Sequence, residues 1–280
     1  MSIELLYTGL LQGLLLAIIA FGMMIPFRFL NFPDLTAEGS YPLGGAVCAS
    51  LMIAGTPQIL AICAAIVAGG LLAVGTSQVA LRLKVNSLLA GIILSTMAYS
   101  INLRIMGKPN IALFNIRDIN IDLLSLTIFV VLCMLPFTLF LHTDFGLRLR
   151  TIGSNPKFSI NHGISVNKYT SLGLFIAGAM FGLAGSLIVQ IQQFMDVGMG
   201  IGIVIHGLAS LMIGESIIGH RTMLRQLASP IIGALIYSQI QGIALSLGLA
   251  PSDLKFFTGG IVLIVLSIQK AGGDKCKYMT

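Results

Sequence analysis

Few side chains in this sequence are arranged for catalysis. It contains no Walker lysine loop, no HExxH, no GxSxG in a strand–turn–helix context and no pair of carboxylates at a useful spacing from a histidine. An intramembrane enzyme acting through His206 or Ser210 is the remaining catalytic interpretation. We expect a non-catalytic protein that binds no cofactor or metal itself, so that ATP and magnesium belong to a partner in any ATP-driven step.

The polar residues inside apolar stretches are better candidates. Charge at membrane depth is unfavourable, and residues that carry it usually face a cavity or a partner. We predict that a polar passage is lined by Asp34, Glu38, Asn102, Arg104, Asp196, Gly200, His206 and Glu215.

Several of these residues also have a structural interpretation. Asp34 and Glu38 flank an interrupted stretch, where a carboxylate can cap the N-terminus of a half-helix. Arg104 can extend its guanidinium to the membrane interface instead of attracting a carboxylate substrate. His206 is more often a hydrogen-bond partner between helices than a ligand.

Two more features have two interpretations each. The glycines that alternate at 196–207, DVGMGIGIVIHG, let backbone groups line a passage or let helices pack closely. Glu215 is either a gate or a partner of Arg221 or Arg225.

Composition sets the class of protein. Of 280 residues, 56% are hydrophobic and only 9% are charged, whereas soluble domains carry roughly a quarter of charged residues. A water-soluble protein is therefore excluded. The net charge of +6 does not indicate nucleic-acid binding, because basic residues beside membrane spans are expected on topological grounds.

Apolar runs near the length of about 20 residues that crosses a bilayer recur along the chain. They predict an all-α, polytopic membrane bundle of eight or nine segments in a single domain, 1–280, with halves of about 1–122 and 123–280. The runs are 5–27, 43–55, 59–80, 87–106, 123–141, 171–191, 201–218, 227–247 and 256–268. The run 43–55 is short and follows FPDLTAEGSYP, whose prolines and acids argue against a continuous helix and for a broken or re-entrant element.

The basic residues divide unequally between the two sides if every run crosses. Twelve fall on one side, which the positive-inside rule makes cytoplasmic: Arg28, Arg82, Lys84, Arg148, Arg150, Lys157, Lys168, Arg221, Arg225, Lys270, Lys275 and Lys277. Four fall on the other: Arg104, Lys108, Arg117 and Lys255. If the element 33–55 re-enters instead, the N-terminus moves inside and Arg28 changes sides.

The longest polar interval is 144–168, DFGLRLRTIGSNPKFSINHGISVNK, on the cytoplasmic side. We interpret it as a docking loop for a second protein; a tether that merely follows the positive-inside rule is the alternative. The sequence ASLMI occurs at 49–53 and again at 209–213. It indicates an inverted internal repeat, with a chance match as the alternative.

Four blocks carry a family resemblance. LNFPDLTAEGSYPLGGA at 30–46, SINLRIMGKPNI at 100–111, GLRLRTIGSNP at 146–156 and MGIGIVIHGLASLMIGES at 199–216 resemble permease subunits of ABC importers in the branched-chain amino acid and ribose permease superfamily. They look most like the branch that includes proposed tryptophan and tyrosine importers. His206 departs from that branch, whose members usually have an aliphatic residue there.

The resemblance implies a permease in the bacterial inner membrane that forms the membrane core with a second permease copy, as a homodimer or a heterodimer. The same resemblance implies two cytoplasmic ATP-binding subunits and an extracytoplasmic substrate-binding protein as partners. It also implies a short coupling helix within 153–163, where Pro156 suits the first helical turn and Ser154 or Asn155 can cap it. The residues that we assign to ATPase coupling are Arg148, Arg150, Gly153, Ser154, Asn155, Pro156, Lys157 and Gly163.

On this interpretation, the protein moves a small solute by alternating access, and the family alone points to an amino acid. Two other classes stay open. An ion-coupled secondary transporter would use Asp34, Glu38 or Asp196 and need no ATPase. A structural membrane scaffold would tolerate the loss of all these charges.

Overall fold

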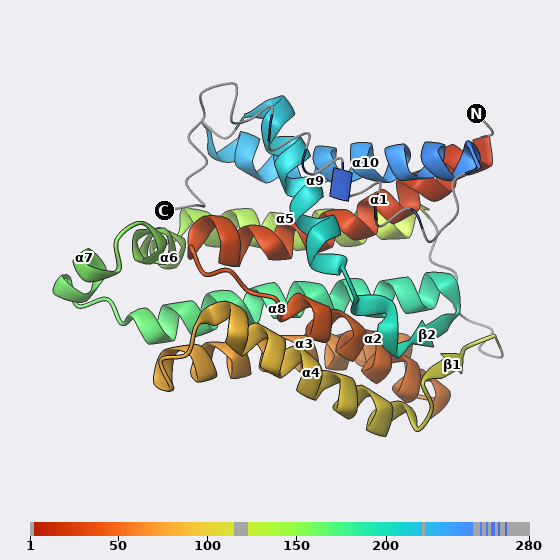
Figure 1. Cartoon of the computed structure of the whole chain (residues 1–280), viewed down its shortest axis with the longest axis horizontal. Coiled ribbons are helices and arrows are strands. Elements are labelled where there is room, and N and C mark those ends of the chain that lie inside the picture. Colours follow the sequence, from red (N-terminus) through yellow and green to blue (C-terminus); the bar gives the residue numbers. More distant parts are fainter. Residues whose placement is uncertain are drawn as a thin grey trace. The chain divides into compact units, whose positions relative to one another are not determined.

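The computed structural model describes residues 3–114, 123–219, 222–248, 253, 256, 259–260, 263 and 267. Its elements are almost all helical (Figure 1). In chain order they are α1 (Ile3–Met24), the π-helical segment η1 (Ile25–Phe29), α2 (Ala37–Ile53), α3 (Gln58–Arg82), α4 (Ser87–Met106), β1 (Asn110–Ala112), α5 (Leu123–His142), α6 (Asp144–Ser154), α7 (Pro156–Asn161), α8 (Val166–Gln192), β2 (Phe194–Asp196), the 3-10 helix η2 (Val197–Gly200), α9 (Ile203–Ile218) and α10 (Met223–Ser246).

Among the described residues, seven helical segments are long and apolar enough to cross a membrane. They confirm a polytopic helical membrane protein. The predicted count of eight or nine is not reached, because α2 has only 17 residues and most of 256–268 lies outside the described residues. The internal repeat stays a prediction.

The interruption before α2 is present, but its position differs from the prediction. Residues 31–35 have no regular structure, and the helix then runs without a break from Ala37 through Gly39 and Pro42 to Ile53. Pro42 lies in the second turn of α2, where it removes one hydrogen bond to the carbonyl of Glu38 and leaves the other helical bonds in place. The broken part is therefore shorter than expected.

The chain forms two compact units, whose boundaries fall inside α1 and α9. The larger unit comprises residues 22–204, and the smaller comprises 1–21 with 205–280.

In the larger unit, α2 and α3 both pack against α8, and α4 packs against α2 and α3. Helices α3 and α8 are antiparallel and lie side by side (Figure 1). A Cβ at Gly178 would overlap the carbonyl of Gly69, and a Cβ at Gly44 would overlap the backbone of Gly182. Without a hydrophobic effect between helices in lipid, such close approach supplies much of the packing energy.

The two ends of the larger unit carry different elements (Figure 1). At one end lie α6 and α7, both inside the interval that was predicted only as a polar loop with one short helix. At the other end β1 pairs antiparallel with β2, with Asn110 opposite Asp196.

In the smaller unit, close approaches join α10 to α9 and to the first half of α1. A Cβ at Gly233 would overlap the carbonyl of Ser210, and one at Gly13 would come within 2.5 Å of Ser238 Oγ. Tyr237 is fully buried in this unit.

Candidate functional site

The short helix predicted within 153–163 is present as α7, and its role in coupling stays a prediction. Asn155 caps it, because its Oδ1 accepts a hydrogen bond from the Phe158 N–H at 3.0 Å. Pro156 occupies the first turn, where a missing N–H removes no helical bond. Gly163 adopts φ +74° just after the helix, a conformation that favours glycine.

Helix α7 presents apolar side chains outward. Phe158 is 49% exposed and Ile160 is 62% exposed, beside an exposed Lys157. Ser159 points inward instead, and its hydroxyl donates to the Asn155 carbonyl at 3.1 Å. Two apolar side chains and one cation of this short helix are therefore accessible to a partner.

The two arginines of α6 make contacts inside the chain. Arg150 donates to the Leu141 carbonyl at 2.8 Å and lies over the Phe29 ring at 5.5 Å, and its burial lowers its pKa. Arg148 donates to the Tyr169 hydroxyl at 2.8 Å. These contacts hold α6 against α5, η1 and α8 and so help to position α7. The assignment of both arginines to ATPase coupling stays a prediction.

Gly153 contributes to the same bracing. A Cβ at this position would overlap the Phe29 carbonyl, so the last turn of α6 lies directly on η1. Ser154 does not cap α7, because its hydroxyl donates to the Thr151 carbonyl at 3.0 Å.

Asp34 is buried between the end of η1 and α2. Its Oδ1 accepts hydrogen bonds from the Thr36 N–H at 2.8 Å and from the Thr36 hydroxyl, which also bonds the Thr76 hydroxyl at 2.7 Å. Its Oδ2 has no hydrogen-bond partner among the described residues. Burial raises the pKa of Asp34 to about 6. Asp34 thus holds Thr36, the residue just before α2, through one carboxylate oxygen and leaves the other without a partner among the described residues.

Glu38 joins the two interrupted segments. Its Oε1 accepts a hydrogen bond from the Gly202 N–H at 3.1 Å, one residue before α9 begins. A Cβ at Gly200 would overlap the Glu38 carbonyl, which is the carbonyl that Pro42 leaves without a helical donor. Of the two interpretations of the alternating glycines, close packing therefore applies at Gly200, where η2 approaches the backbone of α2.

Asp196 lies at the other end of the interrupted segment. Its Oδ1 accepts from the Gly198 N–H at 2.5 Å and caps η2. With its amide nitrogen turned toward Asp196, Asn110 donates to Asp196 Oδ2 at 2.8 Å. Both oxygens of this carboxylate have partners, which favours a structural role over ion binding.

Asn102 and Arg104 point to different surroundings although only one residue separates them. Asn102 is fully buried, and neither atom of its amide has a hydrogen-bond partner among the described residues. Arg104 is exposed. A buried amide without partners is costly, so Asn102 is a good candidate for contact with water or substrate, whereas the position of Arg104 agrees with extension to the interface.

His206 and Glu215 belong to the smaller unit. His206 Nδ1 forms a hydrogen bond of 2.6 Å with the Tyr237 hydroxyl, and the amide nitrogen of Gln241 donates to the same hydroxyl at 3.2 Å. This geometry fits the interhelical interpretation of His206. Glu215 lies half-buried in the last turn of α9; Arg221, one of its expected partners, is outside the described residues.

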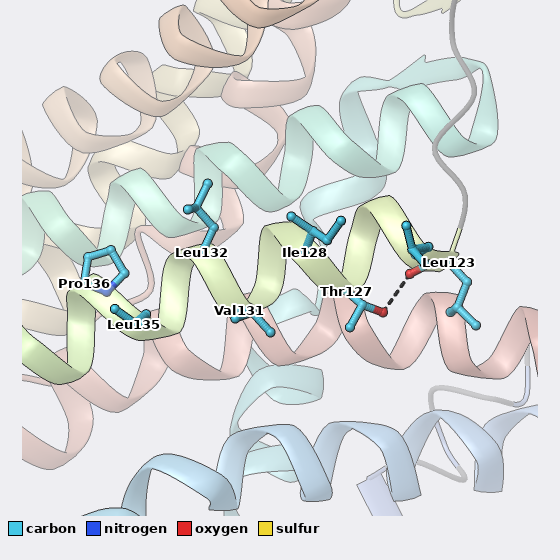
Figure 2. A pocket seen from close by; sticks show the side chains of 8 residues that line it. Leu123, Thr127, Ile128, Val131, Leu132, Leu135 and Pro136 are labelled. Atoms are coloured by element: carbon cyan, nitrogen blue, oxygen red, sulfur yellow. Dashed lines mark hydrogen bonds between the residues drawn. The ribbon is translucent and has the colours of Figure 1, made fainter.

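A groove of about 750 Å³ runs along α5. Figure 2 shows its lining, which is apolar apart from Thr127, whose hydroxyl is turned back onto the Leu123 carbonyl at 2.7 Å. The lining has no charged group that would recognise an amino acid. Its exposed leucines, together with Ile128 and Val131, suit contact with lipid tails.

Comparison with known proteins identifies the family. The family described as "Branched-chain amino acid transport system / permease component" matches residues 5–266. The chain belongs to this family. Its sequence is 36% identical over 261 residues to a tyrosine transport system permease protein of Clostridioides difficile (strain R20291), covering 91% of this chain and 88% of the relative.

Two further relatives match the permease. An uncharacterized protein, RP368, of Rickettsia prowazekii (strain Madrid E) is 33% identical over 280 residues, covering 95% of this chain and 98% of the relative. A nucleoside ABC transporter permease protein, NupC, of Lactococcus lactis subsp. cremoris (strain MG1363) is 34% identical over 61 residues, or 22% and 19% of the two chains. No solved structure matches.

The family and the seven apolar helices confirm an ABC-type permease that crosses the bacterial inner membrane several times. The resemblance inferred from four sequence blocks is thereby confirmed. The roles of individual residues in coupling and passage stay predictions.

Several residues of the permease that hold the predicted side chains have no distinctive pattern in the sequence. The Thr36 hydroxyl bonds Asp34 and is itself bonded to the Thr76 hydroxyl on α3, and Tyr237 holds His206. Residues with hydroxyl groups are common in membrane helices, so only the fold shows that these three bond a charged or polar side chain. Proline spacing could have drawn attention to the Glu38 carbonyl, because Pro42 follows it by four residues.

Proposed function

We propose that this permease imports an amino acid by alternating access, powered by a separate ATPase that binds α7. The observation that carries the proposal is the surface of α7, where Phe158 and Ile160 are exposed beside Lys157. Exposed apolar side chains beside a cation on a short helix outside the membrane are groups that a partner protein can cover. The tyrosine transport permease among its relatives supports an amino-acid substrate.

Membership of the family supports the remaining parts of the proposed transporter. The ATP-binding subunit holds ATP and magnesium, a second permease copy completes the membrane core, and an extracytoplasmic binding protein delivers the substrate. The permease itself has the role of a non-catalytic subunit. The basic residues at the α6–α7 end orient this end toward the cytosol.

The passage in this proposal runs near the contact of Glu38 with Gly202. Interrupted segments are the part of a transporter where backbone groups can line a cavity without exposure to lipid. Movement of α7 with the ATPase would pass through α6 and its braces Arg150 and Gly153 to η1, and η1 leads directly into the interrupted segment.

Co-purification tests the docking surface. We expect Ile160→Ser to reduce capture of the ATPase by about tenfold, the effect of losing one well-buried apolar contact of about 1.4 kcal/mol. Ile59→Ser is the matched control, because Ile59 is 74% exposed at the opposite end of the larger unit. Equal capture by both variants and the wild type would contradict docking on α7.

Reconstitution tests the energy source. Proteoliposomes with the permease, its ATPase, its binding protein and ATP should accumulate tyrosine or a related amino acid, and omission of the ATPase should abolish uptake. Uptake by the permease alone in a proton or sodium gradient would instead support the ion-coupled alternative, for which the free oxygen of Asp34 is the best candidate site.

A further inference from the structure

A second groove opens between the end of α3 and the start of α8. Its volume is about 520 Å³, and two cations, Arg82 on α3 and Lys168 on α8, contribute to its lining. None of the lining residues is acidic, and no described residue forms an ion pair with either cation. The groove is thus a concave surface with two positive charges from two different helices.

The base of the groove is polar and fixed. Ser171 Oγ lies 2.7 Å from Ser77 Oγ and accepts a hydrogen bond from the Gln78 amide at 3.0 Å. Ser77 is fully buried, so this network also joins α3 to α8. The hydrogen bonds between α3 and α8 therefore fix the backbone positions of Arg82 and Lys168 relative to each other.

Farther from the helix ends the surface becomes apolar. Leu172 and Phe175 line the groove on α8, and Phe175 lies against Gly70, where a Cβ would be 2.6 Å from its ring. Leu71, on the same helix as Gly70, is 60% exposed. An exposed leucine on a membrane-spanning helix is suited to contact with lipid tails.

The groove therefore has cations at its outer edge, hydrogen-bonding groups at its base and apolar side chains toward the membrane centre. We propose that it binds one anionic phospholipid of the cytoplasmic leaflet, such as phosphatidylglycerol. The phosphate lies between Arg82 and Lys168, and the acyl chains extend along Leu71 and Leu172. Basic pockets between helices on this side of a membrane recognise such head groups, and a guanidinium suits phosphate oxygens.

The charge pattern favours a lipid over the other anions that could reach this groove. An acidic segment of the ATPase or a free phosphate would use the two cations, but neither would use the apolar part that continues toward the membrane centre. The proposal takes the cytoplasmic orientation of this end from the positive-inside rule and does not depend on the transported substrate.

Native mass spectrometry of the purified permease, without its ATPase, tests the site. We expect phosphatidylglycerol to be retained in preference to phosphatidylcholine. The double variant Arg82→Gln/Lys168→Gln should lose this preference, with affinity reduced about tenfold or more, since each cation near an anionic surface contributes substantially. Arg104→Gln/Lys108→Gln is the control. It removes two exposed cations at and just beyond the C-terminal end of α4, neither of which lines the groove.

Three outcomes would overturn the proposal. The first is equal retention of phosphatidylglycerol by the wild type and the Arg82/Lys168 variant. The second is an equal loss in the Arg104/Lys108 control, which would show a general charge effect. The third is stabilisation by inorganic phosphate as large as that by phosphatidylglycerol. The melting temperature in phosphatidylcholine checks that every variant is folded. Ser171→Val changes the polar base of the groove while both cations stay in place.

Discussion

The Glu38 carboxylate accepts a hydrogen bond from the Gly202 N–H at 3.1 Å, across 164 positions of the chain. It connects the first turn of α2 with the residue that precedes α9. Each of these helices begins after an interrupted segment, and a carboxylate is favoured near helix N-termini. The same acid therefore stabilises one interrupted segment and fixes its distance to the other.

Two substitutions of Glu38 should distinguish the contribution of its hydrogen bond to stability from that of its charge. Glu38→Gln keeps an oxygen acceptor for Gly202, whereas Glu38→Ala removes it, with an expected loss of about 1–3 kcal/mol in stability. Thermal unfolding in detergent measures the difference, with Glu4→Ala as a control at an exposed carboxylate. A larger loss in Glu38→Gln than in Glu38→Ala would contradict this explanation.

A methyl group at Gly200 should push α2 and η2 apart. Gly200→Ala places a Cβ on the Glu38 carbonyl and against Pro42, and overpacking of this kind costs about 1–3 kcal/mol. Gly75→Ala is the control, because its Cβ would meet only Leu94 at an ordinary 3.4 Å. We expect the melting temperature to fall for the first variant only; equal melting temperatures would show that the contact is loose.

Asp34 should make stability depend on pH. Its pKa is raised by burial from 3.8 to about 6, so the folded state binds its proton more tightly than the unfolded state does. Stability is then highest below pH 4 and falls as pH rises through 4 to 6. Asp34→Asn should flatten this part of the profile, which melting curves between pH 4 and 7 would reveal. A profile unchanged by the substitution would place the titrating group elsewhere.

Loss of the Tyr237 hydroxyl should weaken the contact of α9 with α10. Tyr237→Phe keeps the ring in its buried site but removes the hydrogen bonds that the hydroxyl forms with His206 and Gln241. Hydrogen bonds between membrane helices contribute about 0.6 to 2 kcal/mol, so we expect a small fall in melting temperature. If His206 is mainly a partner of Tyr237, His206→Phe in the Tyr237→Phe background should add little; an additive loss would point to a separate role.

The sequence by itself determined the class of protein, the approximate position of most helices, the family and the short helix at 156–161. These properties depend on local information: the length of apolar runs, a proline at a helix start and the excess of basic residues. Only the tertiary structure decided what the polar residues contact. The position of Glu38 beside Gly202, the hydroxyl groups around Asp34 and the bracing role of Arg150 each require two segments to meet. In a chain with so many apolar residues, most helix surfaces have similar side chains, so the pairing of helices depends on where glycines permit close approach, and this is a property of the packed bundle.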